Sequence, residues 1–456
     1  MLTAWQIQNF KAWQDSGTIQ LAPLTVFFGE NNVGKSSLGQ LLLTLKQSAM
    51  SQSVQQPLNF GDAHSLINLG SFAQNLHHAQ VDQPLQFTLQ WRLPETLELH
   101  DVIEHTPLQI DALRLQVSVL ADDNLQPCVQ SICYRADLAS QEQLRVSYCS
   151  SQPDQLQVQV KSPQVLNYSI ALADMHSPER FYQFPATQGA ELSFLQALAE
   201  QTEAILTDFQ ALAALRVAPQ RHYPWAGEVP DNVGRAGETA VAAILAATAQ
   251  ERTLQFAPQH AELPFAQGIA YWLQQMGVAS EFSIQPVPGV SDQYQALLKN
   301  HAAAAEVNLA DLGFGVSQLL PVIVQAFYAQ PNSTVWLEQP EIHLHSLVQA
   351  GLADMLIAAA QATENGHARN VQLVVESHSE HFLNRLQRRI AEGVISHTDV
   401  ALYFCSRSES QVQVERLEVD TYGEIANWPE NLFGDEMTDI AARAMAAVQR
   451  KRQQNN

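Results

Sequence analysis

Near the amino end lies a segment whose pattern leaves few folds open to the chain. It reads Gly29-Glu30-Asn31-Asn32-Val33-Gly34-Lys35-Ser36 and fits G-x-x-x-x-G-K-[ST] in full. The apolar strand Leu24–Phe28 precedes it, and a helix from Lys35 to about Met50 follows, which is the context that the motif requires. The glycines let backbone N–H groups surround a phosphate, and the helix N-terminus adds partial positive charge. Lys35 can reach the β- and γ-phosphates of a nucleotide and the Ser36 hydroxyl can bind Mg²⁺, so the pattern predicts a phosphate-binding loop.

Length and composition describe a large globular protein. The chain has 456 residues, enough for one composite domain or two to three ordinary ones, and 46% of them are hydrophobic. Charged residues make up only 15%, against about 25% in an average domain. The net charge of −22 argues against a surface that coats nucleic acid by charge alone, although a local basic patch stays open.

Hydrophobic periodicity divides the chain into four parts. From about residue 84 to 170 apolar and polar residues alternate, which is typical of half-buried strands in an antiparallel meander. A mainly helical stretch follows, and after about residue 310 helices and strands alternate, which indicates parallel pairing. We therefore expect an α/β fold of two core parts, 1–80 and 306–456, with a β-rich lobe at 81–190 and a mainly helical insertion at 191–305.

The termini and cysteines indicate a soluble bacterial-type cytoplasmic protein. The start MLTAWQIQNF lacks the layout of a signal peptide, and no apolar run approaches 18 residues. Four cysteines are too few for a disulfide scaffold. Cys128 and Cys133 lie five apart on one strand, so they should face opposite sides and share no metal.

Further polar groups follow the later strands. The strand Thr334–Leu337 is followed by Glu338, which can hold Mg²⁺, and by Gln339-Pro340-Glu341-Ile342-His343-Leu344-His345. The next strand, Val371–Val375, leads into Glu376-Ser377-His378. Because carboxyl ends of parallel strands meet at one sheet edge, these groups should converge there. Before them, Gly313-Phe314-Gly315-Val316-Ser317-Gln318 opens the helix Leu319–Tyr328 and forms a second candidate phosphate site.

The order of these motifs resembles the ABC-type ATPases. Within them it is similar to the soluble bacterial group related to SMC-like DNA-repair heads and to the ATPase half of OLD-family nucleases. Ile7-Gln8-Asn9-Phe10-Lys11 and Leu24–Gly29 match that group. The tail Asn427-Trp428-Pro429-Glu430-Asn431-Leu432-Phe433 resembles the end of a subgroup with no well-established function.

The resemblance implies roles for these residues, with ATP and Mg²⁺ as cofactors. The Walker A loop would run from Gly29 to Ser37, and Glu338 would be the Walker B carboxylate. The signature loop would hold Gly315, Ser317 and Gln318, His345 would lie in the loop that crosses the dimer interface, and His378 would sense the γ-phosphate. The implied Walker A residues that contact nucleotide are Gly29, Asn31, Asn32, Gly34, Lys35, Ser36 and Ser37. ABC heads hydrolyse ATP as a head-to-tail pair, so a homodimer is implied.

The sequence departs from the family at Gln339, where most ABC ATPases carry the glutamate that activates water. An amide cannot take a proton at pH 7, although it can orient water. Either Glu341 or Glu338 is the base, or hydrolysis is slow and ATP acts as a dimer clamp. We favour a slow ATPase.

Two further groups of residues have a functional and a simpler interpretation. His343, His345, His378 and His381 have spacings that can bind zinc, but the neighbouring phosphate chemistry explains the first three without it. The basic runs Arg385–Arg389 and Arg450–Arg452 are more typical of solvated faces than of a nucleic-acid contact. Arg221 and Arg235 are weak candidates for phosphate or interface contacts.

Three functional hypotheses follow. The first is an ATPase that dimerises on ATP and gates a separate effector, such as a nuclease, in anti-phage defence. The second is a non-hydrolysing ATP-dependent scaffold, and the third is a DNA-repair or SMC-like ATPase that associates with DNA. Fewer than eighty residues follow His378, too few for a further nuclease domain within this chain.

Overall fold

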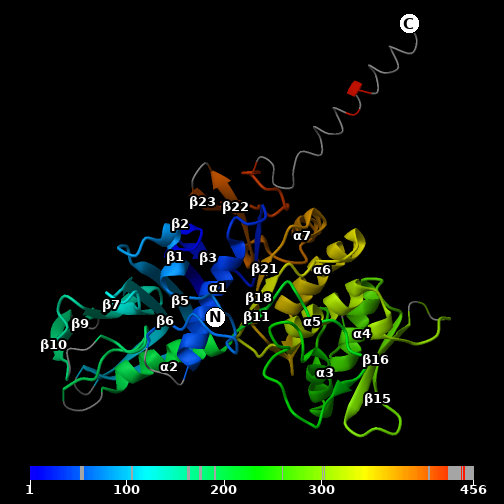
Figure 1. Cartoon of the computed structure of the whole chain (residues 1–456), viewed down its shortest axis with the longest axis horizontal. Helices are drawn as coiled ribbons and strands as arrows, with labels where there is room; N and C mark the ends of the chain where they lie inside the picture. Colours follow the sequence, from blue (N-terminus) through cyan, green and yellow to red (C-terminus); the bar gives the residue numbers. More distant parts are fainter. Residues whose placement is uncertain are drawn as a thin grey trace.

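A computed structural model gives the fold of the chain (Figure 1). It describes residues 1–51, 56–103, 106–161, 165–173, 177–188, 192–258, 260–299, 301, 303–408 and 411–429, together with 443, 445 and 446. Residues 430–433 of the tail that resembles a known subgroup, and the basic run 450–452, lie outside this part.

A six-stranded sheet at the centre carries the phosphate-loop strand. Its order is β11-β18-β21-β4-β22-β23, and every neighbouring pair is parallel except β22 with β23. Its strands are β4 (Leu24–Gly29), β11 (Phe209–Leu212), β18 (Thr334–Glu338), β21 (Gln372–Glu376), β22 (Val400–Ser408) and β23 (Gln411–Leu417). The alternation of strands and crossover helices thus yields the α/β fold expected from the sequence.

A second, antiparallel sheet forms a lobe on one side of the central sheet (Figure 1). Its path is β10-β9-β8-β7-β6-β5-β1-β2, with β3 also paired to β1. The strands are β1 (Leu2–Phe10), β2 (Trp13–Asp15), β3 (Ile19–Gln20), β5 (Leu85–Ile103), β6 (Thr106–Ala121), β7 (Pro127–Leu138), β8 (Gln141–Cys149), β9 (Gln155–Val160) and β10 (Leu166–Ala171).

Helices cover both faces of the central sheet. They are α1 (Lys35–Met50), α2 (Ser193–Thr207), α3 (Ala240–Ala249), α4 (Phe265–Gln275), α5 (Phe314–Tyr328), α6 (Ser346–Ala360) and α7 (Glu380–Ala391), with short 3₁₀ helices at Ala73–Asn75, His77–Ala79, Leu309–Asp311 and His397–Asp399. The remaining short strands are β12 (Tyr223–Pro224), β13 (Thr253–Leu254), β14 (Leu263–Pro264), β15 (Glu281–Pro286), β16 (Gln293–Lys299), β17 (Val307–Asn308), β19 (Thr363–Glu364) and β20 (His367–Ala368).

Each face of the central sheet contributes to its own hydrophobic core. Phe27, Trp336 and Tyr403 point to the face that packs on α1, α2 and the antiparallel sheet. Val26 and Leu337, one residue along, point to the face that packs on α3 to α7. Because successive side chains on a strand point to opposite faces, the nearly unbroken apolar runs of β4, β18 and β21 supply both cores.

Helix α1 approaches the sheet closely at Gly39. A Cβ atom at this position would lie 2.6 Å from the Trp336 ring, which is completely buried. We expect overpacking in Gly39→Ala to cost about 1–3 kcal/mol, against a gain of about 1 kcal/mol in helix propensity, so the variant should lose up to about 2 kcal/mol of stability. Thermal unfolding measures this, with Gly313→Ala as the control because nothing lies within 4 Å of a Cβ there. An unfolding midpoint at or above that of the wild type would contradict the prediction.

The structure qualifies two details of the sequence interpretation. β1 lies in the expected first core part, 1–80, yet it pairs with β5 of the lobe. β11 lies in the expected helical insertion, 191–305, yet it pairs with β18 of the central sheet. The expectation that Cys128 and Cys133 face opposite sides is wrong. A β-bulge between Val129 and Ser131 adds one residue to β7, so both cysteines alternate with inward-facing neighbours and lie on the outer face.

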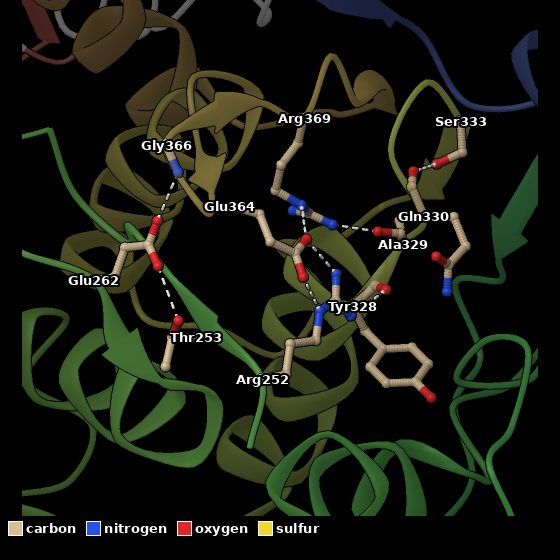
Figure 2. A network of polar contacts seen from close by, with 10 residues as sticks. All are labelled: Arg252, Thr253, Glu262, Tyr328, Ala329, Gln330, Ser333, Glu364, Gly366 and Arg369. Carbon is tan, nitrogen blue, oxygen red and sulfur yellow. Dashed lines mark hydrogen bonds and ion pairs between the residues drawn. The ribbon is translucent and has the colours of Figure 1, made fainter. Parts of the chain in front are cut away.

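The end of α5 is held by a buried ion-pair network (Figure 2). Arg252 donates to both carboxylate oxygens of Glu364, at 2.7 and 2.9 Å, and Arg369 Nε lies 3.2 Å from the same carboxylate. The two guanidinium groups also donate to the carbonyls of Tyr328 and Ala329. These carbonyls lie at the C-terminus of α5, where cations interact favourably with the helix dipole and its free acceptors. The network therefore fixes the helix whose first turn carries Gly315, Ser317 and Gln318.

Candidate functional site

The loop between β4 and α1 closes around the side chain of Lys35. Its ammonium donates to the carbonyls of Gly29 and Glu30, at 3.0 and 2.6 Å, and only 3% of the residue is exposed. Burial lowers the pKa of Lys35, and the nearby Glu376 carboxylate opposes that shift. The lysine therefore lies within the curve of the loop, where it can exchange the two carbonyls for phosphate oxygens.

Gly29 is needed for the path of this loop. Its φ is +137°, and a Cβ atom would lie 2.0 Å from the carbonyl oxygen of Cys405 on β22. A side chain at this position would push the loop away from the sheet edge. Gly34 caps α1 in a left-handed conformation, and Asn31 and Asn32 are exposed between the two glycines.

The hydroxyl groups at the start of α1 have different partners. Ser36 donates to Glu376 Oε1 at 3.0 Å. The Ser37 hydroxyl instead donates back to the Gly34 carbonyl, and the Trp13 indole donates to both of these groups at 3.0 Å. Ser36 thus faces the carboxyl end of β21, and Ser37 braces the loop.

Glu338 ends β18 at the same edge, one strand further from the loop. Its carboxylate forms an ion pair with Arg235 at 2.8 Å. The buried Arg216 donates to the backbone carbonyls of Glu338, Gln339 and Gln318. Burial lowers the pKa of Arg216 to about 10. Arg216 therefore ties the segment after β18 to the start of α5, and Arg235 is the ion-pair partner of Glu338.

The side chain of Glu341 contacts the backbone of His378 near this sheet edge. The Glu341 carboxylate accepts a hydrogen bond from the backbone N–H of His378 at 2.6 Å, and only 7% of Glu341 is exposed. Burial raises the pKa of Glu341, and that hydrogen bond opposes the shift. Burial, helped by the charge of Lys35, lowers the pKa of His378 to about 4. His378 is therefore neutral at pH 7, with one ring nitrogen that can donate a hydrogen bond and one that can accept.

The remaining candidates lie at the starts of α5 and α6. Ser317 and Gln318 are buried in the first turn of α5, and a Cβ atom at Gly315 would lie 3.0 Å from the His343 carbonyl. His345 is exposed, and its Nδ1 accepts from the Leu347 N–H at 3.4 Å as the cap of α6. Gln339 has a left-handed φ of +42°, and its backbone N–H donates to the Glu376 carbonyl.

Unpartnered polar atoms gather at this edge. Six of the eleven buried side-chain nitrogen and oxygen atoms without a hydrogen bond in the described residues lie here, on Arg216, Arg235, Gln318, Glu341, Glu376 and His378. Buried polar atoms normally have partners, so this concentration fits a polar ligand. Within the described ranges no group of three or more His, Cys, Asp or Glu is placed to hold a metal ion, which gives the zinc interpretation no support. A Mg²⁺ ion bound through one or two carboxylates, a hydroxyl and nucleotide phosphates fits the same residues.

Three of the residues at this edge were missed or undervalued by sequence reasoning. Glu376 lies next to the loop, and Arg216 donates to three backbone carbonyls. Arg235 pairs with Glu338, whereas Arg221 pairs with Asp311, away from this edge. A carboxylate directly after an apolar strand was the signal for Glu376.

No helix in the described part of the chain is both long and apolar enough to cross a membrane.

Comparison with known protein families finds two matched segments. Residues 273–384 match the family described as "AAA domain, putative AbiEii toxin, Type IV TA system", and residues 395–442 match a "Protein of unknown function (DUF3696)". The first segment includes Gly315, Glu338 and His378, whereas the loop 29–37 lies outside it. A comparison with curated proteins finds no match.

Several solved SMC heads are similar to most of the chain at low identity. The SMC head bound to the C-winged helix domain of ScpA has 9% identity and a TM-score of 0.43, covering 92% of this chain and 98% of that one. The SMC head domain from Thermotoga maritima has 9% identity and a TM-score of 0.35, covering 92% and 99%. The Smc head with an extended coiled coil bound to the C-terminal domain of ScpA, from Pyrococcus furiosus, has 8% identity and a TM-score of 0.39, covering 91% and 96%.

The central parallel sheet carries the phosphate-loop motif between β4 and α1. The chain therefore has the α/β fold of a P-loop NTPase, and its residues 273–384 are similar to the AAA domain family.

Proposed function

We propose that the protein binds ATP with Mg²⁺ at the loop between β4 and α1 and hydrolyses it slowly. The observation that carries this proposal is the position of Lys35 inside the loop, with Ser36 facing the carboxylates at the same sheet edge. Backbone N–H groups and Lys35 would hold the phosphates. Ser36 and Glu338 are the metal ligands that the family resemblance implies. Mg²⁺, when bound, would neutralise charge that develops on the phosphates.

Glu341 is the proposed general base, because Gln339 carries no titratable group. It is buried, its Oε2 atom has no hydrogen-bond partner, and its pKa is raised by burial. A base works best when its pKa lies near the operating pH, so a raised carboxylate pKa suits this role. His378, neutral beside Lys35, would contact the γ-phosphate.

Head-to-tail pairing is the second part of the proposal. The exposed His345 and the first turn of α5, with Gly315, Ser317 and Gln318, would meet the nucleotide bound to the other copy. ATP would then act as a clamp between two copies, and opening and closing would gate a separate effector. A nuclease in an anti-phage system is the effector class that we propose, and co-purification with the product of the neighbouring gene tests it.

Lys35→Ala should weaken ATP binding by about 10- to 100-fold, because it removes a charge-assisted contact of about 1.5–3 kcal/mol to the phosphates. Binding of ATP and release of phosphate are measured on the purified full chain. Lys161→Ala is the matched control, since its lysine lies in the lobe and pairs with Glu142. Equal ATP affinity in the wild type and Lys35→Ala would contradict the proposed site.

A non-hydrolysing scaffold is the alternative that Gln339 favours. It predicts ATP binding and ATP-dependent dimerisation with no phosphate release above the Lys35→Ala background. Sedimentation with and without ATP, measured beside the turnover assay, separates the two functions.

A further inference from the structure

Glu376 ends a strand that is adjacent to the phosphate-loop strand β4. It ends β21, which lies between β4 and β18. The register pairs Glu376 with Phe27 on one side and with Glu338 on the other. Residues paired across parallel strands project to the same face, so both carboxylates project to the face covered by α1. Glu376 is one strand closer to Ser36.

The carboxylate of Glu376 is buried without an ion pair. Only 4% of the residue is exposed, Oε1 accepts the Ser36 hydroxyl at 3.0 Å, and Oε2 has no hydrogen-bond partner. Among the described residues no lysine, arginine or histidine lies within 4.0 Å of its oxygens. An unpaired carboxylate is costly to bury, so this group is matched to a cation that arrives from outside the chain.

Glu338 presents the opposite situation. Its carboxylate is already paired with Arg235 at 2.8 Å, and the side chain of Arg235 is itself three-quarters buried, with 24% exposed. A metal ion at Glu338 would have to compete with that guanidinium. Glu376 offers a free oxygen and a neighbouring hydroxyl, which are hard ligands that suit Mg²⁺.

We propose that Glu376, together with Ser36, is the principal protein ligand of the divalent cation that accompanies ATP, and that Glu338 mainly balances Arg235. The inference rests on the proposed nucleotide site and changes which carboxylate serves it. With the cation bound, the Ser36 oxygen would offer it a lone pair, and the hydroxyl proton would stay available for donation to Glu376 Oε1. The two side chains would then be ligands of one ion.

Binding of a fluorescent ATP analogue to the full chain, in Mg²⁺ and in EDTA, tests this inference. We expect Mg²⁺ to tighten binding to the wild type. Glu376→Gln should lose at least tenfold of that tightening, while its affinity in EDTA stays equal or rises because a negative charge near the phosphates is removed. Glu338→Gln should lose less, since its carboxylate is shared with Arg235.

Ser36→Ala provides an independent variant. It should lose the Mg²⁺ effect to a similar extent, and the double variant with Glu376→Gln should lose less than the sum of the two, because both act through one ion. Full Mg²⁺ tightening in Glu376→Gln, with loss in Glu338→Gln, would overturn the inference and leave the nucleotide site intact. Absence of ATP binding to the wild type would instead overturn the proposed function.

Discussion

Glu364→Gln should lower the free energy of unfolding by about 3–5 kcal/mol, because it removes the single carboxylate between two buried guanidinium groups. The side chain of Arg369 is completely buried and that of Arg252 is 12% exposed. Without Glu364 the two positive charges face each other in a medium that screens them poorly. The pKa of Glu364 is held below its ordinary value: burial acts to raise it, but the hydrogen bonds and charges of Arg252 and Arg369 outweigh burial.

Urea unfolding followed by circular dichroism measures this loss. Glu281→Gln is the matched control, because it breaks an exposed ion pair with Lys299 and should leave the midpoint unchanged. The effect should also reach the candidate site. The network holds the C-terminus of α5 (Figure 2), and the N-terminal part of the same helix carries Ser317 and Gln318. A midpoint within error of the wild type would show that the network adds nothing to stability.

The stability of the nucleotide-free protein should depend on pH through Glu376. Burial, with the charges of Glu338 and Glu341, raises its pKa from 4.5 to about 7, although Ser36 and Lys35 act to lower it. The folded state then binds more protons than the unfolded state between these two values. Stability contributed by this group is therefore full below about pH 4.5 and is lost as pH rises to 7, by about 3 kcal/mol.

His378 works in the opposite direction over part of the same range. Burial and Lys35 lower its pKa from 6.5 to about 4, so its contribution to stability rises with pH across that interval. In the wild type the opposite pH dependences of Glu376 and His378 partly cancel. A variant at each position separates them.

Unfolding of wild type and Glu376→Gln at pH 5 and pH 8, without nucleotide or metal, isolates the carboxylate. From pH 5 to pH 8 the wild type should lose about 3 kcal/mol of its free energy of unfolding through Glu376. Glu376→Gln should not show this loss, because glutamine cannot ionise. His378→Gln should change in the reverse sense between pH 4 and 6.5. A wild-type-to-Glu376→Gln difference that is the same at both pH values would refute the expected burial of this charge.

Local patterns gave the parts of the fold that depend on neighbours in sequence. The helix expected from Lys35 to about Met50 has those bounds in the structure, and the strand before it extends by one residue to Gly29. The strand was recognisable as a short continuous apolar run, which is buried on both faces, and the helix by its leucines at helical spacing.

Pairing between distant segments could not be read in this way. The residues of β1 do not predict whether this strand pairs with β5 of the lobe, as it does, or with β4 of the central sheet. Register is set by tertiary contacts, and a single bulge in β7 reversed the expected side of Cys128 or Cys133.

The sequence motifs pointed to several residues of the candidate site, but the ion pairs within it could not be predicted from them. The motifs identified Lys35, Glu338 and His378 because their spacing follows strand ends. Arg216 and Arg235 came from a connecting segment without periodicity, and only the folded chain brings Arg235 to Glu338. Glu376 was passed over because the histidine two residues later drew the functional interpretation.

Because β1 pairs with β5, the lobe is structurally continuous with the amino-terminal strand of the protein. Leu2 to Gln8 lie in register with Trp91 to Gln86, and Trp5 shares one core with Phe27 and Trp336 beneath the phosphate loop. Removing the antiparallel strands β5 to β10 would leave β1 with an unpaired, exposed strand edge, which promotes aggregation. The lobe therefore shares its hydrophobic core with the strand that leads into the phosphate loop.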